Sequence, residues 1–376
     1  MGGLRKFLSF VNIRPGRFSL VEYCQSFENV CLYGTGQFFK DVFVSHDFKK
    51  RFHVKYISDS REERIDELKD AVSNSAFSGV NFIYPSDISS ISNVLVITMF
   101  RDDWALRKAL TAQGIPVVGG FELALEMDVD TGFDGKADPE GFLEFYELLQ
   151  DDYSREAFVN ILANRLAPEF AVKPYSSFNI HMPYYFNDRS LLLSRHECFV
   201  DCGAYNGDTI RDFLKYSNGV FDSIYAFELE KGNYDALNSY MNSLNCSEKI
   251  TCYNAGVGDR NEIVTFGKNE AGTNECFSLS KTDACVQTGQ INRLDDVLYG
   301  KKISLIKMDI EGSEMSALRG AENLIKQNHP RFLVCPYHRI KDFYEIPAYL
   351  LSIHGDYHFR LLHQTDEVYD TVMIVE

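Results

Sequence analysis

A glycine-rich stretch in the second half of the chain, DCGAYNGDT, follows a short apolar run. Gly203 and Gly207 let the backbone approach a ligand without a Cβ in the way. Asn206 tolerates left-handed backbone geometry, and Asp208 or Thr209 can begin the helix that follows. Such a turn at the carboxyl end of a buried strand predicts a ligand site at the edge of a parallel sheet.

The acids around this turn indicate which ligand the site takes. Asp201 suits a cationic, amino-acid-like group better than a pyrophosphate. Glu228 stands about twenty residues past the last glycine, where an acid can take both hydroxyls of a ribose. The backbone around Gly256 or the side chain of Asp259 can meet an adenine edge. S-adenosylmethionine is the ligand that needs an acid for its ammonium group, an acid for its ribose and no phosphate cradle.

Five segments in a fixed order strengthen this interpretation. They are FVDCGAYNGDTI, YAFELEKGNYDAL, INRLDDVL, IKMDIEGSEMSALRGAENLI and CPYHRIKDFYEIPAYLLSI. Over residues 185–376 they resemble the FkbM family of S-adenosylmethionine-dependent methyltransferases. The glycines of the first turn stand further apart than in the G-x-G that methyltransferases favour.

The resemblance implies a seven-stranded methyltransferase sheet and O-methylation, often of a sugar hydroxyl in glycan or natural-product assembly. It implies cofactor contacts at Asp201, Gly203, Glu228 and the 254–259 turn. To these we add Asn206, Gly207, Thr209, Gly256, Asp259 and Asp309 as expected cofactor-binding residues.

The resemblance also implies a reactive centre near Asp309, Glu311 and His338. His338 is the candidate base, because it follows a strand at the reactive edge and imidazole titrates in the useful range. Asp309 would orient the acceptor or the histidine, and Glu311 would bind an acceptor hydroxyl. Two alternatives stay open: the three residues bind a divalent ion that lowers the pKa of the hydroxyl, or His338 caps the next helix.

Strands alternate with helices in two parts of the chain, which predicts α/β architecture with parallel sheets. We expect an N-terminal helical segment (1–29), a Rossmann-like α/β domain (30–130), a helical bridge with a connecting loop (131–184) and an FkbM-like methyltransferase domain (185–376). In the last domain, strands are expected at 198–202, 223–228, 249–254, 303–310 and 332–337, helices at 208–217, 232–244, 313–327 and 340–353, a polar loop at 269–290, and a terminal hairpin.

Composition limits the class of protein. The 376 residues carry 38 Lys and Arg against 54 Asp and Glu, a net charge of −16, which argues against nucleic acid as a partner. The nine cysteines form no C-x-x-C pair, so we expect reduced thiols and a cytoplasmic location. No apolar run is long enough for a transmembrane segment. The basic start up to Phe18 predicts a packed amphipathic helix, with contact to an anionic membrane surface as the alternative.

The first expected domain has its own glycine turn, LYGTGQFFKDV, with Asp59 ending the next strand. Phe39 stands where a third small residue usually allows tight packing in a dinucleotide site. This domain could bind a nucleotide-linked sugar, or it could be structural and hold a homo-oligomer together. Two functions therefore compete with methyl transfer to a small-molecule or glycan acceptor: a nucleotide-sugar oxidoreductase or epimerase, and a non-catalytic cofactor-binding module.

Overall fold

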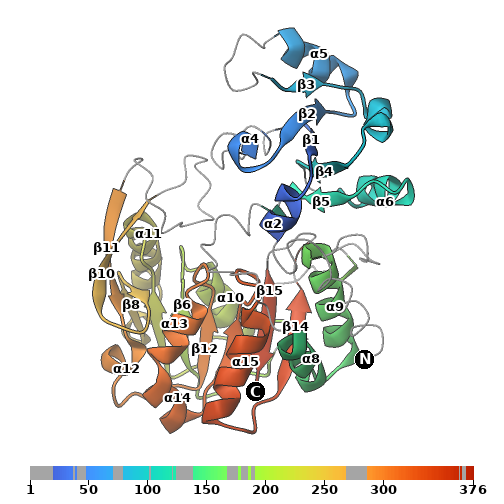
Figure 1. Cartoon of the computed structure of the whole chain (residues 1–376). Helices are drawn as coiled ribbons and strands as arrows, with labels where there is room; N and C mark the ends of the chain where they lie inside the picture. Colours follow the sequence, from blue (N-terminus) through green and yellow to red (C-terminus); the bar gives the residue numbers. More distant parts are fainter. Residues whose placement is uncertain are drawn as a thin grey trace. The chain divides into compact units, whose positions relative to one another are not determined.

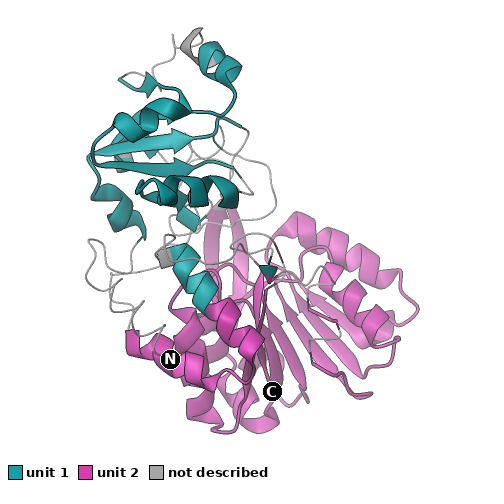
Figure 2. Ribbon diagram, turned by 90° about the vertical axis from the view of Figure 1, so that its right-hand side faces the viewer, with its two compact units in different colours: residues 1–137, 159–177, 366–368 teal, residues 138–158, 178–365, 369–376 magenta. Residues whose placement is uncertain are grey.

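A computed structural model describes the protein at residues 20–36, 39, 48–70, 79–100, 103–120, 122–123, 139–166, 177–178, 185–187, 191–267, 286–363, 365 and 370–376. The chain forms two compact units (Figure 2). Unit 1 comprises residues 1–137, 159–177 and 366–368, and unit 2 comprises residues 138–158, 178–365 and 369–376. The basic start (1–18) and residues 268–285 of the expected polar loop lie outside the described residues, as does Tyr184, an aromatic residue just before the expected methyltransferase domain.

Unit 1 contains a five-stranded parallel sheet in the order β3-β2-β1-β4-β5 (Figure 1). Its strands are β1 (Asn29–Tyr33), β2 (Val54–Ser58), β3 (Asn81–Phe82), β4 (Val94–Thr98) and β5 (Val117–Gly119). Its helices are α2 (Leu20–Gln25), α4 (Phe48–Arg51), α5 (Glu62–Asp70), the 3-10 helix η2 (Pro85–Ser90) and α6 (Trp104–Ala112). The order reverses direction at β1, as in a Rossmann-like sheet, which agrees with the expected fold class. The two-residue strand β3 is too short for a sequence pattern to predict.

Unit 2 is built on a seven-stranded sheet in the order β14-β15-β13-β12-β6-β7-β8. The strands are β6 (Cys198–Cys202), β7 (Ser223–Phe227), β8 (Ile250–Tyr253), β12 (Leu305–Met308), β13 (Arg331–Val334), β14 (Phe359–His363) and β15 (Thr371–Val375). β6, β7, β8, β12 and β13 are parallel, and β15 runs antiparallel between β13 and β14. The seven-stranded methyltransferase sheet and its terminal hairpin are thus confirmed.

The helices of this unit are α10 (Asp208–Tyr216), α11 (Lys231–Asn242), η5 (Ser247–Lys249), α12 (Leu294–Val297), α13 (Glu314–Arg319), α14 (Glu322–Asn328) and α15 (Asp342–Ile353). Helix α8 (Pro139–Leu148) also belongs to unit 2 and contacts α15. Helix α9 (Asp152–Leu166) begins in unit 2, and its residues from 159 on are assigned to unit 1. A second small sheet, β10-β11-β9, consists of β9 (Gly256–Val257), β10 (Glu262–Gly267) and β11 (Val286–Asn292).

Two local predictions were wrong. The expected helix 313–327 is two helices, because the carbonyl of Gly320 accepts a hydrogen bond from Asp295 N–H and the Asp295 carboxylate accepts from Leu324 N–H at the start of α14. The end of the expected polar loop, residues 286–290, is strand, because it pairs with β10. Among the described residues, no helix combines the length and apolar character needed to cross a bilayer.

Candidate active site

The glycine turn after β6 lies against the ends of both neighbouring strands. Gly203 N–H and Ala204 N–H donate to the carbonyl of Phe227, at the end of β7, over 3.0 and 2.9 Å. On the other side, Asp309 N–H donates to the Cys202 carbonyl. Gly203 has φ +79°, and a Cβ there would stand 2.0 Å from the carbonyl oxygen of Asp309. The glycine is therefore required by the close approach of two strand ends, and the turn directly adjoins Asp309.

Glu228, the residue after β7, is held at the same turn. Its carboxylate accepts hydrogen bonds from Tyr205 N–H and Glu230 N–H, both at 2.9 Å. Only 7% of the residue is exposed, and this burial raises the pKa of the carboxyl to about 7, although the two N–H groups oppose the rise. Asn254 donates to the Glu228 carbonyl and so fixes the backbone. The structure thus brings the predicted ribose-binding acid next to the predicted glycine turn.

Asp201 is placed differently from an exposed acid. It is fully buried, and one oxygen lies 3.2 Å from the Nζ of Lys307, its neighbour in the pairing of β6 with β12. Burial raises the pKa of Asp201 to about 6, against the pull of the lysine. Lys307 Nζ also donates to the Gly203 carbonyl over 2.6 Å. The geometry favours an indirect role, in which Asp201 holds the lysine that fixes the glycine turn.

Asp309 follows β12 and is oriented by two phenols. Tyr185 donates to one carboxylate oxygen at 2.7 Å, and Tyr337 donates to the other at 3.1 Å. Burial favours the protonated acid, but Lys307, His338 and the two phenols outweigh it, so the pKa of Asp309 lies below its usual value. Asp309 is therefore a fixed anion at the carboxyl edge of the sheet.

His338 lies between carboxylates. Its Nδ1 is 3.1 Å from the buried Glu314, and its Nε2 is 3.2 Å from Glu311 and 3.7 Å from Asp309. Burial alone would lower the pKa of the imidazole, but Glu314 and Glu311 outweigh it and hold that pKa well above the usual value. The flanking carboxylates thus favour the protonated, cationic form of the imidazole.

Glu311 is the most accessible carboxylate of this cluster, with about a third of its side chain exposed. Its backbone has φ +55°, followed by Gly312 at +86°, and this tight turn comes directly after β12. Burial raises the pKa of Glu311, against the effect of His338. Glu311 and the imidazole Nε2 lie 3.2 Å apart, so the carboxylate is placed as an ion-pair partner of the protonated imidazole.

The expected metal set changes by one member. A ligand atom from each of Asp309, Glu314 and His338 lies within 4.8 Å of the others, so Glu314 stands in place of Glu311. Both ring nitrogens of His338, however, face carboxylates at ion-pair distance. A metal ligand must be a neutral imidazole with a free lone pair. Glu314 and Glu311 raise the pKa of His338 well above its usual value, which favours proton chemistry over metal binding.

Three other predicted residues belong to the glycine turn after β6 and to the start of α10, and a fourth lies in β9. Gly207 has φ +86° and precedes α10, Asn206 accepts a hydrogen bond from Arg211, and Thr209 is buried in the first turn of α10. Gly256 packs on Ile291, its partner in β11.

Asp259 stands apart from this group. It is exposed, it pairs with Arg260, and its N–H donates to Ser316.

In unit 1, the acid beside the glycine turn is Asp59, and it forms hydrogen bonds within the unit itself. The Asp59 carboxylate accepts from Thr35 N–H and the Thr35 hydroxyl, at 2.8 and 2.7 Å, and from Arg61 N–H at 2.9 Å. In a dinucleotide site the corresponding acid binds ribose hydroxyls. Phe39 fills the core of this unit. These contacts weigh against the oxidoreductase alternative.

Comparison with protein families identifies the type of domain formed by residues 201–361. The model described as the methyltransferase FkbM domain matches residues 201–361, which include the glycine turn, Glu228 and the Asp309 cluster. This part of the chain is an FkbM methyltransferase domain.

Solved structures agree with the FkbM fold. The crystal structure of methyltransferase FkbM from Methylobacillus flagellatus KT aligns with a TM-score of 0.69 and 22% identity, covering 100% of this chain and 98% of that one. Aeropyrum pernix fibrillarin in complex with natively bound S-adenosyl-L-methionine aligns with a TM-score of only 0.31 and 11% identity, over 52% of this chain and 69% of that one. Comparison with curated proteins gave no match.

Three residues of the FkbM domain site were not among the predicted site residues. Lys307 had a visible signal, since it is the one charge inside the apolar run ISLIKM. Glu314 belongs to the D-x-E-G-x-E pattern, but its burial against His338 depends on the tertiary fold. Tyr185 lies 124 positions before Asp309, and only the fold brings its hydroxyl there. Phe186, beside it, packs on Phe199 and Phe213.

Proposed function

We propose that the FkbM domain transfers a methyl group from S-adenosylmethionine to a hydroxyl of a sugar or glycan precursor. One observation carries the proposal. The glycine turn that holds Glu228 packs directly on Asp309, so the cofactor-binding residues and the Asp309–Glu311–His338 cluster share one edge of the sheet. Methyl transfer needs the donor and the acceptor side by side, because alignment of two reactants can lower the barrier by about 7–11 kcal/mol.

The chain offers a fitting set of groups for the cofactor. Glu228 is buried and oriented by two N–H groups, so its remaining lone pairs are available for the hydroxyls of a ribose. Lys307 fixes the carbonyl of Gly203, and Asp201 holds Lys307 in place. The anionic Asp309 supplies negative charge near a sulfonium and an ammonium group. When bound, S-adenosylmethionine supplies a methyl group that is already activated.

The acceptor hydroxyl has to lose a proton, and the cluster around His338 can take it. We assign first receipt of the proton to Glu311, which is the accessible carboxylate. His338 stays protonated and holds Glu311 in position, while Glu314 stabilises the imidazolium from the buried side. A positioned base of this kind contributes about 10²–10⁴-fold to the rate. His338 thus acts in the proton transfer as part of a pair rather than as a free imidazole.

The acceptor class follows from the FkbM resemblance, which implies a sugar hydroxyl. The site agrees in chemistry, because the carboxylates of Asp309 and Glu311 offer oxygen atoms that can accept hydrogen bonds from a polyhydroxyl compound.

The test incubates the full chain with labelled S-adenosylmethionine and a glycan extract, with nucleotide-linked sugars in a parallel sample. We expect a sugar whose mass has increased by one methyl substitution, and we expect transfer to persist in EDTA. Incorporation into no carbohydrate, despite tight cofactor binding, would favour a non-catalytic module. Binding of NAD in preference to S-adenosylmethionine would favour the oxidoreductase alternative.

A further inference from the structure

A second cluster of ligand-type side chains lies at the opposite edge of the seven-stranded sheet. His329 ends α14 just before β13, His354 follows α15, and Asp356 lies in the turn that leads to β14. Because β13 is parallel to β12, the residues before its first position lie at the amino edge of these strands. Asp309 and Glu228 lie at the carboxyl edge. The cluster is therefore separate from the methyl-transfer site.

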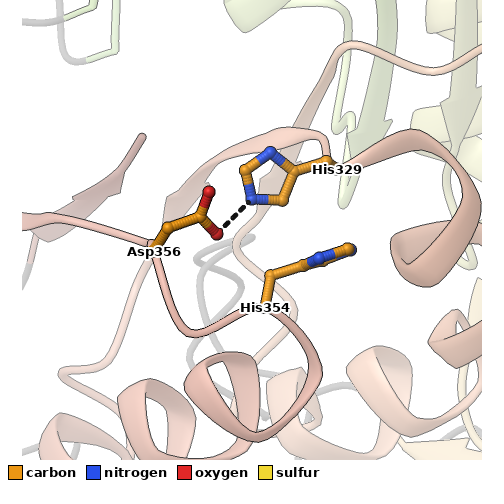
Figure 3. A group of neighbouring side chains, drawn as sticks. All are labelled: His329, His354 and Asp356. Carbon is orange, nitrogen blue, oxygen red and sulfur yellow. Dashed lines mark ion pairs between the residues drawn. The ribbon is translucent and has the colours of Figure 1, made fainter.

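The three side chains converge (Figure 3). One ligand atom from each lies within 4.8 Å of the other two. The Nε2 of His329 is 3.1 Å from a carboxylate oxygen of Asp356, which the dashed line marks. A zinc ion binds nitrogen and oxygen at about 2.0–2.2 Å, so two of its tetrahedral ligands stand about 3.3–3.6 Å apart. The 3.1 Å between His329 and Asp356 is slightly shorter than this, so a small shift of either side chain would let both bind one ion.

The surroundings hold both rings in position. The Nε2 of His354 lies 3.1 Å from the carbonyl oxygen of Ile325, and that carbonyl can only accept. The Nε2 of His354 therefore carries the proton and Nδ1 keeps the lone pair, which is the arrangement that orients histidine ligands of metals. The ring of His329 stacks on Tyr357 at 4.6 Å, and the hydroxyl of the buried Tyr357 donates to the Pro330 carbonyl.

The backbone of His329 also brings its ring to this place. It has φ +47° and ψ 54°, the left-handed conformation in which a helix usually ends with glycine. A residue with a side chain adopts this conformation at a cost of about 1–2 kcal/mol. A histidine at this position points its ring at the 354–356 turn, where glycine would leave no ligand.

We propose that His329, His354 and Asp356 bind one divalent late transition ion, such as Zn²⁺, with water completing its coordination. Two imidazoles and one carboxylate suit zinc, copper or nickel, whereas magnesium and calcium prefer sets made only of oxygen. The ion joins the end of α14 to the α15–β14 turn. It stabilises the fold at the amino edge and takes no part in methyl transfer.

The test uses the full chain, freed of metal with EDTA and dialysed. Titration calorimetry with Zn²⁺ should show one ion per chain, and the melting temperature should rise with the Zn²⁺ concentration. His329→Ala and His354→Ala should each weaken Zn²⁺ binding by at least about tenfold. Even the loss of a residue that only hydrogen-bonds to a metal ligand lowers metal affinity by about 10–100-fold. Asp356→Asn, which keeps the shape of the side chain and removes its charge, should also weaken Zn²⁺ binding. His358→Ala is the matched control, because His358 is an exposed histidine of the same segment outside the cluster.

Copper provides an independent readout. The Cu²⁺-loaded protein should show electron paramagnetic resonance couplings from two imidazole nitrogens, and from one in His354→Ala. A His338→Asn variant that still binds one Zn²⁺ with unchanged affinity would place the ion away from the Asp309 cluster. The proposal is wrong if the chain takes up no Zn²⁺, or if His329→Ala and His354→Ala bind as tightly as His358→Ala.

Discussion

Replacing Glu228 with glutamine is the sharpest perturbation of the proposed cofactor site. The carboxylate accepts one hydrogen bond from Tyr205 N–H and one from Glu230 N–H, and a carboxylate has further lone pairs for a ligand. Glutamine has nearly the same shape but only one acceptor oxygen, and its amide group would face a backbone N–H donor. Glu228→Gln therefore keeps the volume of the site and removes one charged acceptor.

The expected loss follows from the hydrogen bonds involved. A hydrogen bond to a charged group contributes about 1.5–3 kcal/mol. If one such bond to a ribose hydroxyl is lost, cofactor affinity falls roughly 10- to 100-fold, because about 1.4 kcal/mol corresponds to a factor of ten.

The effect should also depend on pH. The pKa of Glu228 is about 7 in the free protein, so the anion that binds the hydroxyls becomes scarce as the pH falls through that value. One pH unit below the pKa, about a tenth of the carboxyls are ionised, and wild-type affinity should weaken about tenfold. Glu228→Gln should lack this dependence.

The assay is titration calorimetry with S-adenosylhomocysteine over a pH series, with thermal unfolding measured in parallel. Glu248→Gln, the same change at an exposed position of the same unit, is the control. Affinity of Glu228→Gln within about twofold of the control, in a protein with an unchanged melting temperature, would refute the assignment of Glu228 to the cofactor.

Three further results are expected. Lys307→Met leaves Asp201 buried without its cation and should lower the free energy of unfolding, measured in urea, by about 3–5 kcal/mol. Adding Asp201→Asn should restore part of this loss. A wild-type urea midpoint for Lys307→Met would contradict the pairing. Glu311→Gln should lower kcat by about 10²–10⁴-fold with cofactor affinity unchanged, so a normal kcat would exclude Glu311 as the proton acceptor. Wild-type activity should decline at alkaline pH, where the imidazolium of His338 loses its proton, and the pH–activity profile of His338→Asn should lack this decline. An activity that instead rises with pH through the ordinary imidazole range would identify neutral His338 as the base.

Much of the fold followed from local patterns. Apolar runs such as CFVDC gave strands buried on both faces, as parallel sheets require, and glycine turns gave their ends. The break between α13 and α14 was missed because it depends on Gly320 packing against Gly258 and bonding Asp295, neither of which is near in sequence. Strand β11 was missed because TGQIN is polar and gains its order only from pairing with β10.

The site residues likewise fall into those that local sequence predicts and those that depend on the tertiary fold. Glu228 and Asp309 were predictable, because an acid after an apolar strand has to lie at the carboxyl edge of the sheet. The pairing of Asp201 with Lys307 was not, because it depends on the register of β6 against β12. The charge of His338 was also out of reach, since Glu314 reaches Nδ1 only after α13 has packed in place.

The most direct test of the methyl-transfer proposal is a crystal structure of the chain with S-adenosylhomocysteine. We predict that the ribose hydroxyls lie within hydrogen-bond distance of Glu228 and that the sulfur faces the Asp309–Glu311 side of the glycine turn. A nucleoside bound in unit 1, or anywhere other than the carboxyl ends of β6, β7 and β12, would contradict it.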